Sequence, residues 1–435
     1  MRLPVVMRPV WRPDQRGPVT AGGCPPGGSP VGVRLVEGPA RRRRTCHRDA
    51  VHSRWSAPWS VTALAVVSVL ALFGVLATVP AVGSAAGGRL VATGLQGADA
   101  QQAARDQQAL DRRLPALWAF VQEERGLTKR RDVPVEVLDD DAYTAALEDG
   151  DWPEADDSTA TALGQDGAGR AADDSVGFYD DVRKRVFVRA DEADLLEQTV
   201  VHELTHALQD QWFGFSLSRP WADGEGDRAL AYDALVEGDA MRVERAWYAS
   251  RPAGARAHVD ALELERYGAP VSRGSGRYEQ DFDADIDFPY VAGRLMVEAV
   301  LAKGGQPLLD ATFVTPPLST AQVLHPALVG SGYPPSPPPP SGPGELVDSG
   351  TLGELGLALL LGEDPTDPDA PEVGWQGDSY RTYETADETC LYARIEMADA
   401  DSRDEVVDVV RDLDEDGLRA RAEGPASLTL TSCGS

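Results

Sequence analysis

The chain has 435 residues, of which 42% are hydrophobic, so it can bury the core of one large domain or of two to three ordinary domains and is not disordered throughout. Its formal net charge is −29 at pH 7, but the first 60 residues contain eleven arginines against three acids, a balance of +8. The other 375 residues therefore carry −37. This acidity argues against a nucleic-acid partner and favours either cationic substrates or simple solubility.

An uncharged run of 22 residues, 61–82, follows the basic segment. We expect residues 61–83 to form one transmembrane helix, because such a run can cross a hydrocarbon core of about 30 Å. The arginines before it, among them Arg48 and Arg54, place residues 1–60 in the cytoplasm as a disordered tail. The predicted protein is thus a single-pass protein of the cytoplasmic membrane with its acidic part outside. The alternative is a signal peptide cleaved near residues 81–86, which would release a secreted protein.

Four cysteines divide evenly between the two sides of this membrane. Cys24 and Cys46 precede the apolar run, whereas Cys390 and Cys433 follow it. Because the second pair would lie in an oxidising compartment, we expect Cys390 and Cys433 to form a disulfide. The alternating segments around them predict that the bond joins two strands, and two buried free thiols are the alternative.

The first elements beyond the membrane follow from hydrophobic periodicity. Residues 101–124 have helical spacing, and Pro115 predicts an interruption there. A strand at 133–138, a short helix at 142–147 and a loop at 150–175 come next. Residues 177–188 contain two short β-prone runs around a polar turn at 180–184, which predicts a hairpin.

The hairpin leads into a helix that contains the motif HELTH. We expect Asp194 to cap this helix and Glu197 to complete a capping box. His202 and His206 are four residues apart, so both imidazoles can reach one zinc ion from the same helix face. Glu203 projects nearby and would deprotonate the metal-bound water. Independent placement of residues would produce this motif in only about one of two hundred such chains.

A catalytic zinc ion usually has three protein ligands, and Glu237 is the candidate for the third. It lies near the centre of a predicted helix at 232–244, among apolar residues. The alternative is a carboxylate on a solvated helix face. A metzincin is excluded, because Gln209 and Trp212 stand where that class needs glycine and histidine. Asp239, or else Asp233, is a candidate to orient a ligand histidine through its second nitrogen.

HELTH followed by VEGDA resembles the gluzincin zinc metalloproteases with the HExxH…EGxA pattern, in the peptidase MA-like superfamily. The segment 288–305 resembles the Tyr-x-x-Gly helix of that superfamily. The resemblance implies an α+β fold, with a zincin-like, mostly helical catalytic core and a small edge-exposed sheet. It also implies one Zn²⁺ per chain, bound by His202, His206 and Glu237, with Glu203 as the base and Tyr290 stabilising the oxyanion.

By the same resemblance the reaction is hydrolysis of peptide bonds in a peptide or protein substrate, which would pair with an edge strand at 185–190. A structural tyrosine in the core is the alternative reading of Tyr290. Two features depart from the family. No G-x-M-E-N segment is present, so exopeptidase activity is not implied, and Met241 stands where thermolysin-like enzymes have aspartate.

We therefore expect a metallopeptidase domain at 84–330, a proline-rich linker at 331–344 and a C-terminal accessory α/β region at 345–435 with a helix at 352–361. His258 and His325 have no predicted role in the site. The rival hypothesis is a non-catalytic binding or scaffold module on the same fold.

Overall fold

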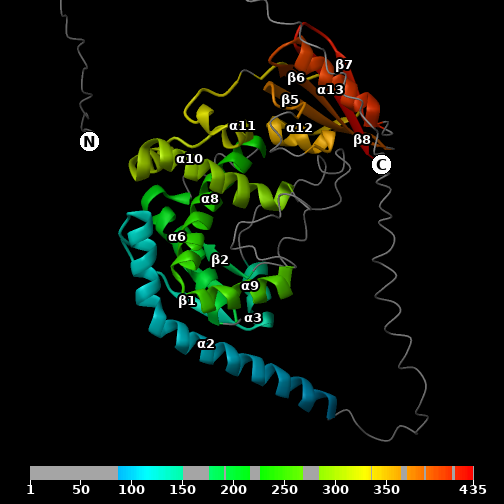
Figure 1. Cartoon of the computed structure of the whole chain (residues 1–435). Coiled ribbons are helices and arrows are strands. Elements are labelled where there is room, and N and C mark those ends of the chain that lie inside the picture. Colours follow the sequence, from blue (N-terminus) through cyan, green and yellow to red (C-terminus); the bar gives the residue numbers. More distant parts are fainter. Residues whose placement is uncertain are drawn as a thin grey trace, which may run out of the picture. The chain divides into compact units, whose positions relative to one another are not determined.

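The computed structural model of this chain has an α+β fold, as predicted (Figure 1). It describes residues 87–149, 176–190, 193–215, 226–267, 284–334, 336–363, 370–386, 388–413 and 417–434. The predicted tail, the predicted membrane span at 61–83 and the whole of the predicted loop at 150–175 lie outside these ranges. Within them, no helix is both long enough and apolar enough to cross a bilayer.

The first described helix, α2 (Gly87–Arg125), runs without interruption through Pro115, so the predicted break is wrong. A proline removes one backbone hydrogen bond from a helix interior. Packing supports the helix on both sides of that position, because Leu110, Leu117 and Val121 are buried in one core cluster. The helix ends before Gly126, whose φ of 69° is the left-handed conformation typical of a residue after a helix C-terminus.

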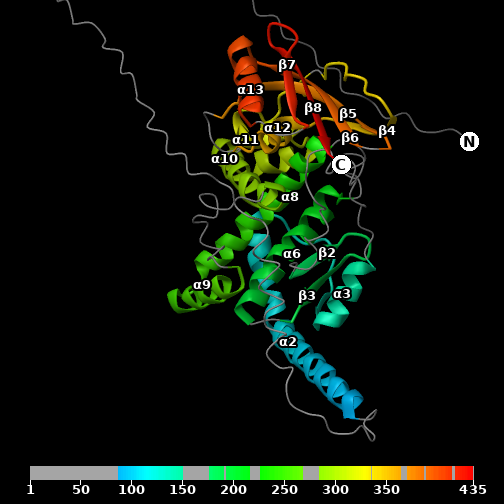
Figure 2. The same cartoon turned by 90° about the vertical axis from the view of Figure 1, so that its right-hand side faces the viewer.

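A three-stranded sheet lies beside the helices in the order β1-β3-β2. Its strands are β1 (Val135–Leu138), β2 (Gly177–Asp180) and β3 (Arg185–Arg189). β2 and β3 form the predicted antiparallel hairpin, whereas β1 is parallel to β3. The short helix α3 (Asp140–Glu148) lies beside this sheet and is capped by the carboxylate of Asp139 (Figure 2).

β3 is the central strand, so the expectation that residues 185–190 form an edge is wrong. The reason is visible in its composition, since Val186, Phe187 and Val188 are consecutive and all buried. A strand buried on both faces has such a continuous apolar run, whereas a half-exposed strand alternates. Among the described residues, the edges of this sheet are β1 and β2.

Among the described residues of this part of the chain, four long helices follow the sheet strands. They are α6 (Ala193–Phe213), α8 (Gly226–Ser250), α9 (Ala253–Tyr267) and α10 (Ala284–Val314), the last kinked at Gly305. α6 begins one residue before Asp194, so Asp194 lies in the first turn and is not the cap that the sequence predicts. Its carboxylate pairs with Arg251, and Glu197 pairs with Arg113 of α2. Both carboxylates of the expected capping box are thus paired with arginines, one in the bend between α8 and α9 and one on α2.

Two glycines let α8 and α10 approach closely. A Cβ added to Gly238 would overlap the backbone of Gly293, and a Cβ added to Gly293 would overlap the backbone of Ala234. The two helices therefore pack backbone against backbone, which only glycine permits at both positions. This contact sets the position of Glu237 and Tyr290, since each lies within three residues of one of the glycines.

The C-terminal part contains a five-stranded antiparallel sheet in the order β4-β5-β6-β8-β7. The strands are β4 (Glu345–Gly350), β5 (Trp375–Glu384), β6 (Thr389–Met397), β7 (Arg419–Ala422) and β8 (Ser427–Gly434). The helices α12 (Gly353–Leu361) and α13 (Ala400–Leu413) contribute to one core cluster with β5, β6 and β8. Cys390 and Cys433 stand opposite each other on β6 and β8 and form the predicted disulfide.

The proline-rich segment contacts this sheet. The hydroxyl of Ser379 donates a hydrogen bond to the carbonyl of Pro337, and a Cβ added to Gly342 would overlap the ring of Tyr392. A cavity of about 790 Å³ lies between this segment, β5 and the short helix α11 (Thr320–Leu324), with Trp375 in its lining. The domain boundaries at 330 and 344 stay predictions.

Asp227, in the first turn of α8, is buried against the elements that follow α10. Its carboxylate accepts hydrogen bonds from the backbone N–H of Thr320 (2.8 Å), the hydroxyl of Thr320 (2.6 Å) and the hydroxyl of Tyr333 (3.1 Å). Burial raises the pKa of Asp227 to about 6. A titratable group therefore joins α8 to the segment around α11.

Candidate metal centre

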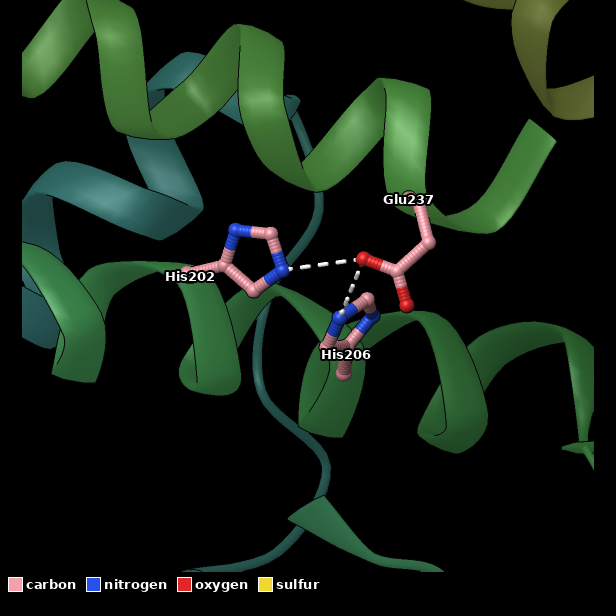
Figure 3. Close-up of side chains that lie close together, drawn as sticks. All are labelled: His202, His206 and Glu237. Atoms are coloured by element: carbon pink, nitrogen blue, oxygen red, sulfur yellow. Dashed lines mark hydrogen bonds and ion pairs between the residues drawn. The ribbon is translucent and has the colours of Figure 1, made fainter. Parts of the chain in front are cut away.

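Three of the residues singled out in the sequence converge on one point (Figure 3). His202 and His206 point from α6 toward α8, and Glu237 reaches toward them from α8. One carboxylate oxygen, Oε2 of Glu237, lies 3.0 Å from Nε2 of His202 and 3.4 Å from Nε2 of His206. The three candidate ligand atoms all lie within 4.8 Å of one another, so this group could hold a metal ion.

The donor set fits a tetrahedral ion. Zinc binds imidazole nitrogen and carboxylate oxygen at about 2.0–2.1 Å, which places neighbouring ligand atoms of a tetrahedron roughly 3.3 Å apart. The two separations from Glu237, 3.0 and 3.4 Å, bracket that value. Hydrogen bonds from protonated imidazoles give similar separations. The geometry is thus compatible with a bound metal ion or with protonated imidazoles.

Each histidine is oriented through its other ring nitrogen. Nδ1 of His202 lies 2.9 Å from Oε2 of Glu244, and Nδ1 of His206 lies 3.0 Å from Oε1 of Gln209. Both partners are acceptors, so each Nδ1 carries a hydrogen and each Nε2 of a neutral ring has its lone pair toward Glu237. Hydrogen bonds of this kind fix the tautomer and orientation of metal-binding histidines.

Asp239 reaches the site indirectly. The amide of Gln209 donates to Oδ2 of Asp239 (3.1 Å), and Gln209 in turn contacts His206. The same oxygen accepts a hydrogen bond from Nε of Arg125 at 2.6 Å, and both side chains of this ion pair are completely buried. A chain of contacts therefore runs from the last residue of α2 to a candidate metal ligand.

Glu203 lies next to the histidines in the sequence and is buried, with 6% of its surface exposed. Burial raises the pKa of Glu203. Within the described part of the chain, no residue donates a hydrogen bond to its carboxylate. Gly177 of β2 packs beside it, since a Cβ added there would lie 3.4 Å from Cγ of Glu203 and 2.5 Å from Cγ2 of Thr199. A glycine therefore keeps the space beside this carboxylate open.

Tyr290 comes to the same region from α10. Its ring centroid lies 6.3 Å from that of His202, and the residue is 38% exposed. The negative charge of Glu237 holds the pKa of Tyr290 well above its usual range. The hydroxyl therefore stays protonated at neutral pH and can donate a hydrogen bond.

Carboxylates lie beside both histidines, and they favour a positive charge among them. Burial alone would lower the pKa of His202, but hydrogen bonds to Glu237 and Glu244 hold that pKa well above its usual range. The two histidines in turn hold the pKa of Glu237 well below its usual range, against the effect of burial. Carboxylates that stabilise a proton on an imidazole in this way would also stabilise a metal cation.

A second group of candidate ligand atoms lies in the C-terminal sheet, at Glu388, Cys390 and Cys433. Both cysteines are joined in the disulfide, so neither offers a thiolate to a metal ion. The cavity of about 790 Å³ beside the proline-rich segment contains none of the candidate ligands.

Comparison of the chain with models of protein families, with curated proteins and with solved structures found no match. The resemblance to gluzincins therefore rests on the motifs alone. Sequence reasoning missed Glu244, Gln209 and Arg125. Helical spacing could have identified the first two. Glu244 lies seven residues after Glu237, and Gln209 lies three residues after His206, so each returns to the helix face of a candidate ligand. Arg125 has no such local signal.

Proposed function

We propose that this protein is a zinc-dependent peptidase whose metal ligands are His202, His206 and Glu237. The observation that carries the proposal is the convergence of these three side chains around one oxygen of Glu237, with each histidine oriented by a separate acceptor. Two imidazole nitrogens from α6 and one carboxylate oxygen from α8 would occupy three positions of a tetrahedral zinc ion. The fourth position stays open for water or substrate, as in catalytic zinc sites.

The proposed hydrolysis needs three groups: the zinc ion, Glu203 and Tyr290. Zinc held there would polarise the substrate carbonyl and acidify a water molecule. Glu203 takes a proton from the attacking water and returns it to the leaving amine, for which its raised pKa suits it. The hydroxyl of Tyr290 donates to the negative charge that develops on the carbonyl oxygen. These roles follow from the resemblance together with the positions of the side chains.

The substrate strand needs an edge beside Glu203. Since β3 is central, β2 takes the place that we expected for residues 185–190. β2 is an edge strand among the described residues, and its first residue, Gly177, packs beside Glu203. An extended peptide that pairs with β2 would therefore lie next to the proposed base.

The proposed location is outside the cytoplasmic membrane, with residues 61–83 as an anchor or a cleaved signal. The disulfide between Cys390 and Cys433 supports it, because such bonds persist in oxidising compartments. Protease added to intact cells that produce the chain should digest the part beyond residue 83; protection of that part would overturn the proposed topology.

The test of the function is bound metal followed by hydrolysis. Full-length protein should contain about one zinc per chain by elemental analysis. His202→Ala and Glu237→Ala should both lose it, whereas His258→Ala, an exposed histidine on α9, should not. Glu203→Gln should retain zinc and lose peptide hydrolysis.

The outcomes separate the hypotheses. A parent protein without zinc would refute the metal site. Zinc with no hydrolysis of any peptide would instead favour the binding or scaffold module. Full activity in zinc-loaded Glu203→Gln would contradict the proposed base.

A further inference from the structure

One carboxylate near the candidate metal centre has no role in the proposed chemistry. Asp233 lies four residues before Glu237 on α8, which is about one helical turn and places it on the same face. Its side chain is exposed, whereas the three residues that follow it, Ala234, Leu235 and Val236, are buried. Glu237 reaches from α8 toward α6 (Figure 3). The spacing of four residues places Asp233 on the same side of α8, one turn nearer the beginning of the helix.

The electrostatic surroundings of Asp233 belong to the site. The charges that act on it are those of Glu237 and His206, and its own charge raises the pKa of Tyr290. It is therefore within electrostatic range of a candidate ligand on each of two helices and of the proposed oxyanion donor. It is not a member of the metal-binding group itself.

Asp233 differs in its contacts from the other aspartate of this helix segment. Asp239 is fully buried and bonds to Arg125, Gln209 and Arg242. Among the described residues, none donates a hydrogen bond to Asp233 or forms an ion pair with it. An accessible carboxylate beside other carboxylates gains most from a cation that arrives from outside.

We infer that Asp233 is a specificity-determining residue that binds a cationic group of the peptide substrate, an ammonium or guanidinium, close to the scissile bond. The inference rests on the proposed peptidase function. The charge of Glu237 disfavours ionisation of Asp233, and a cation beside Asp233 would favour the ionised carboxylate. The net charge of −37 on residues 61–435 would draw such substrates to the protein.

The test is a library of synthetic peptides with lysine or arginine at each position, made with free and with acetylated amino termini. Zinc-loaded full-length protein should cleave peptides at a fixed distance from the cationic residue. If the cation is instead the terminal ammonium, acetylation should abolish the preference. Asp233→Asn should lower kcat/KM about 10- to 100-fold more for the preferred peptides than for neutral peptides.

Two further variants separate recognition from structure. Asp233→Lys should reverse the preference toward acidic peptides, which a purely structural role would not produce. Glu265→Gln, an exposed carboxylate on α9, is the matched control and should behave as the parent protein. Binding of the preferred peptides to Glu203→Gln protein, measured by calorimetry, should weaken by the same factor when Asp233→Asn is added.

Each result is decisive. Cleavage without any preference for a cationic group, or the same preference in Asp233→Asn, would overturn the inference and leave the peptidase function standing. Loss of zinc from Asp233→Asn would also overturn it, because the residue would then support the metal. No cleavage of any peptide by the zinc-loaded parent would remove the proposed function and this inference with it.

Discussion

Replacing Arg125 with methionine should lower the free energy of unfolding by about 3–5 kcal/mol, because the change leaves a buried carboxylate without its cation. Arg125 and Asp239 are both completely buried, and their closest atoms are 2.6 Å apart. The other carboxylate that Arg125 contacts, Asp310, is 36% exposed, so water can replace the guanidinium there. The magnitude therefore comes mainly from Asp239, and it corresponds to a fall in Tm of roughly 5–12 °C.

Arg113→Met is the matched control on the same helix. Arg113 pairs with Glu197 at 2.8 Å, but its side chain is 45% exposed, and exposed pairs contribute only about 0–1 kcal/mol. Thermal unfolding followed by circular dichroism should therefore separate the two variants clearly. Adding Asp239→Asn to Arg125→Met should restore part of the loss, because the charge that lacks a partner is gone. Equal Tm values for Arg125→Met and Arg113→Met would refute the reasoning.

Three further predictions concern the metal site, the disulfide and pH. Glu244→Ala removes the acceptor for Nδ1 of His202, so the dissociation constant for zinc should rise about 10- to 100-fold in a chelator competition; an unchanged constant would argue against an orienting role. The disulfide of Cys390 joins positions 43 residues apart, so its reduction should lower the free energy of unfolding by about 4 kcal/mol in urea titrations, and equal stability of both forms would contradict this. Burial raises the pKa of Asp227 from 3.8 to about 6. The folded state therefore binds this proton more tightly than the unfolded state, which stabilises the fold. The full stabilisation is present below about pH 4 and is lost as pH rises through 6. Tm should therefore fall less between pH 5 and pH 8 in Asp227→Asn than in the parent protein, and identical pH profiles would count against a titrating Asp227.

The hairpin and the HELTH helix were predictable because their determinants are local. His202 and His206 share a helix face by spacing alone, and the hairpin follows from two β-prone runs around one turn. The predicted break at Pro115 failed for the opposite reason. Burial of apolar residues on both sides of the proline outweighs the hydrogen bond that it removes.

By itself, the sequence determined the α+β class, the two histidines of HELTH with Glu203 between them and the pairing of Cys390 with Cys433. Only the tertiary structure decided that β3 is central and that Glu244 and Gln209 orient the histidines. It also decided that Arg125, more than a hundred residues away, is the partner of Asp239. The physical reason is that spacing along one helix is set by backbone geometry, whereas a contact between two helices depends on how closely they pack. Here that packing depends on two glycines, Gly238 and Gly293, whose pairing no local pattern reveals.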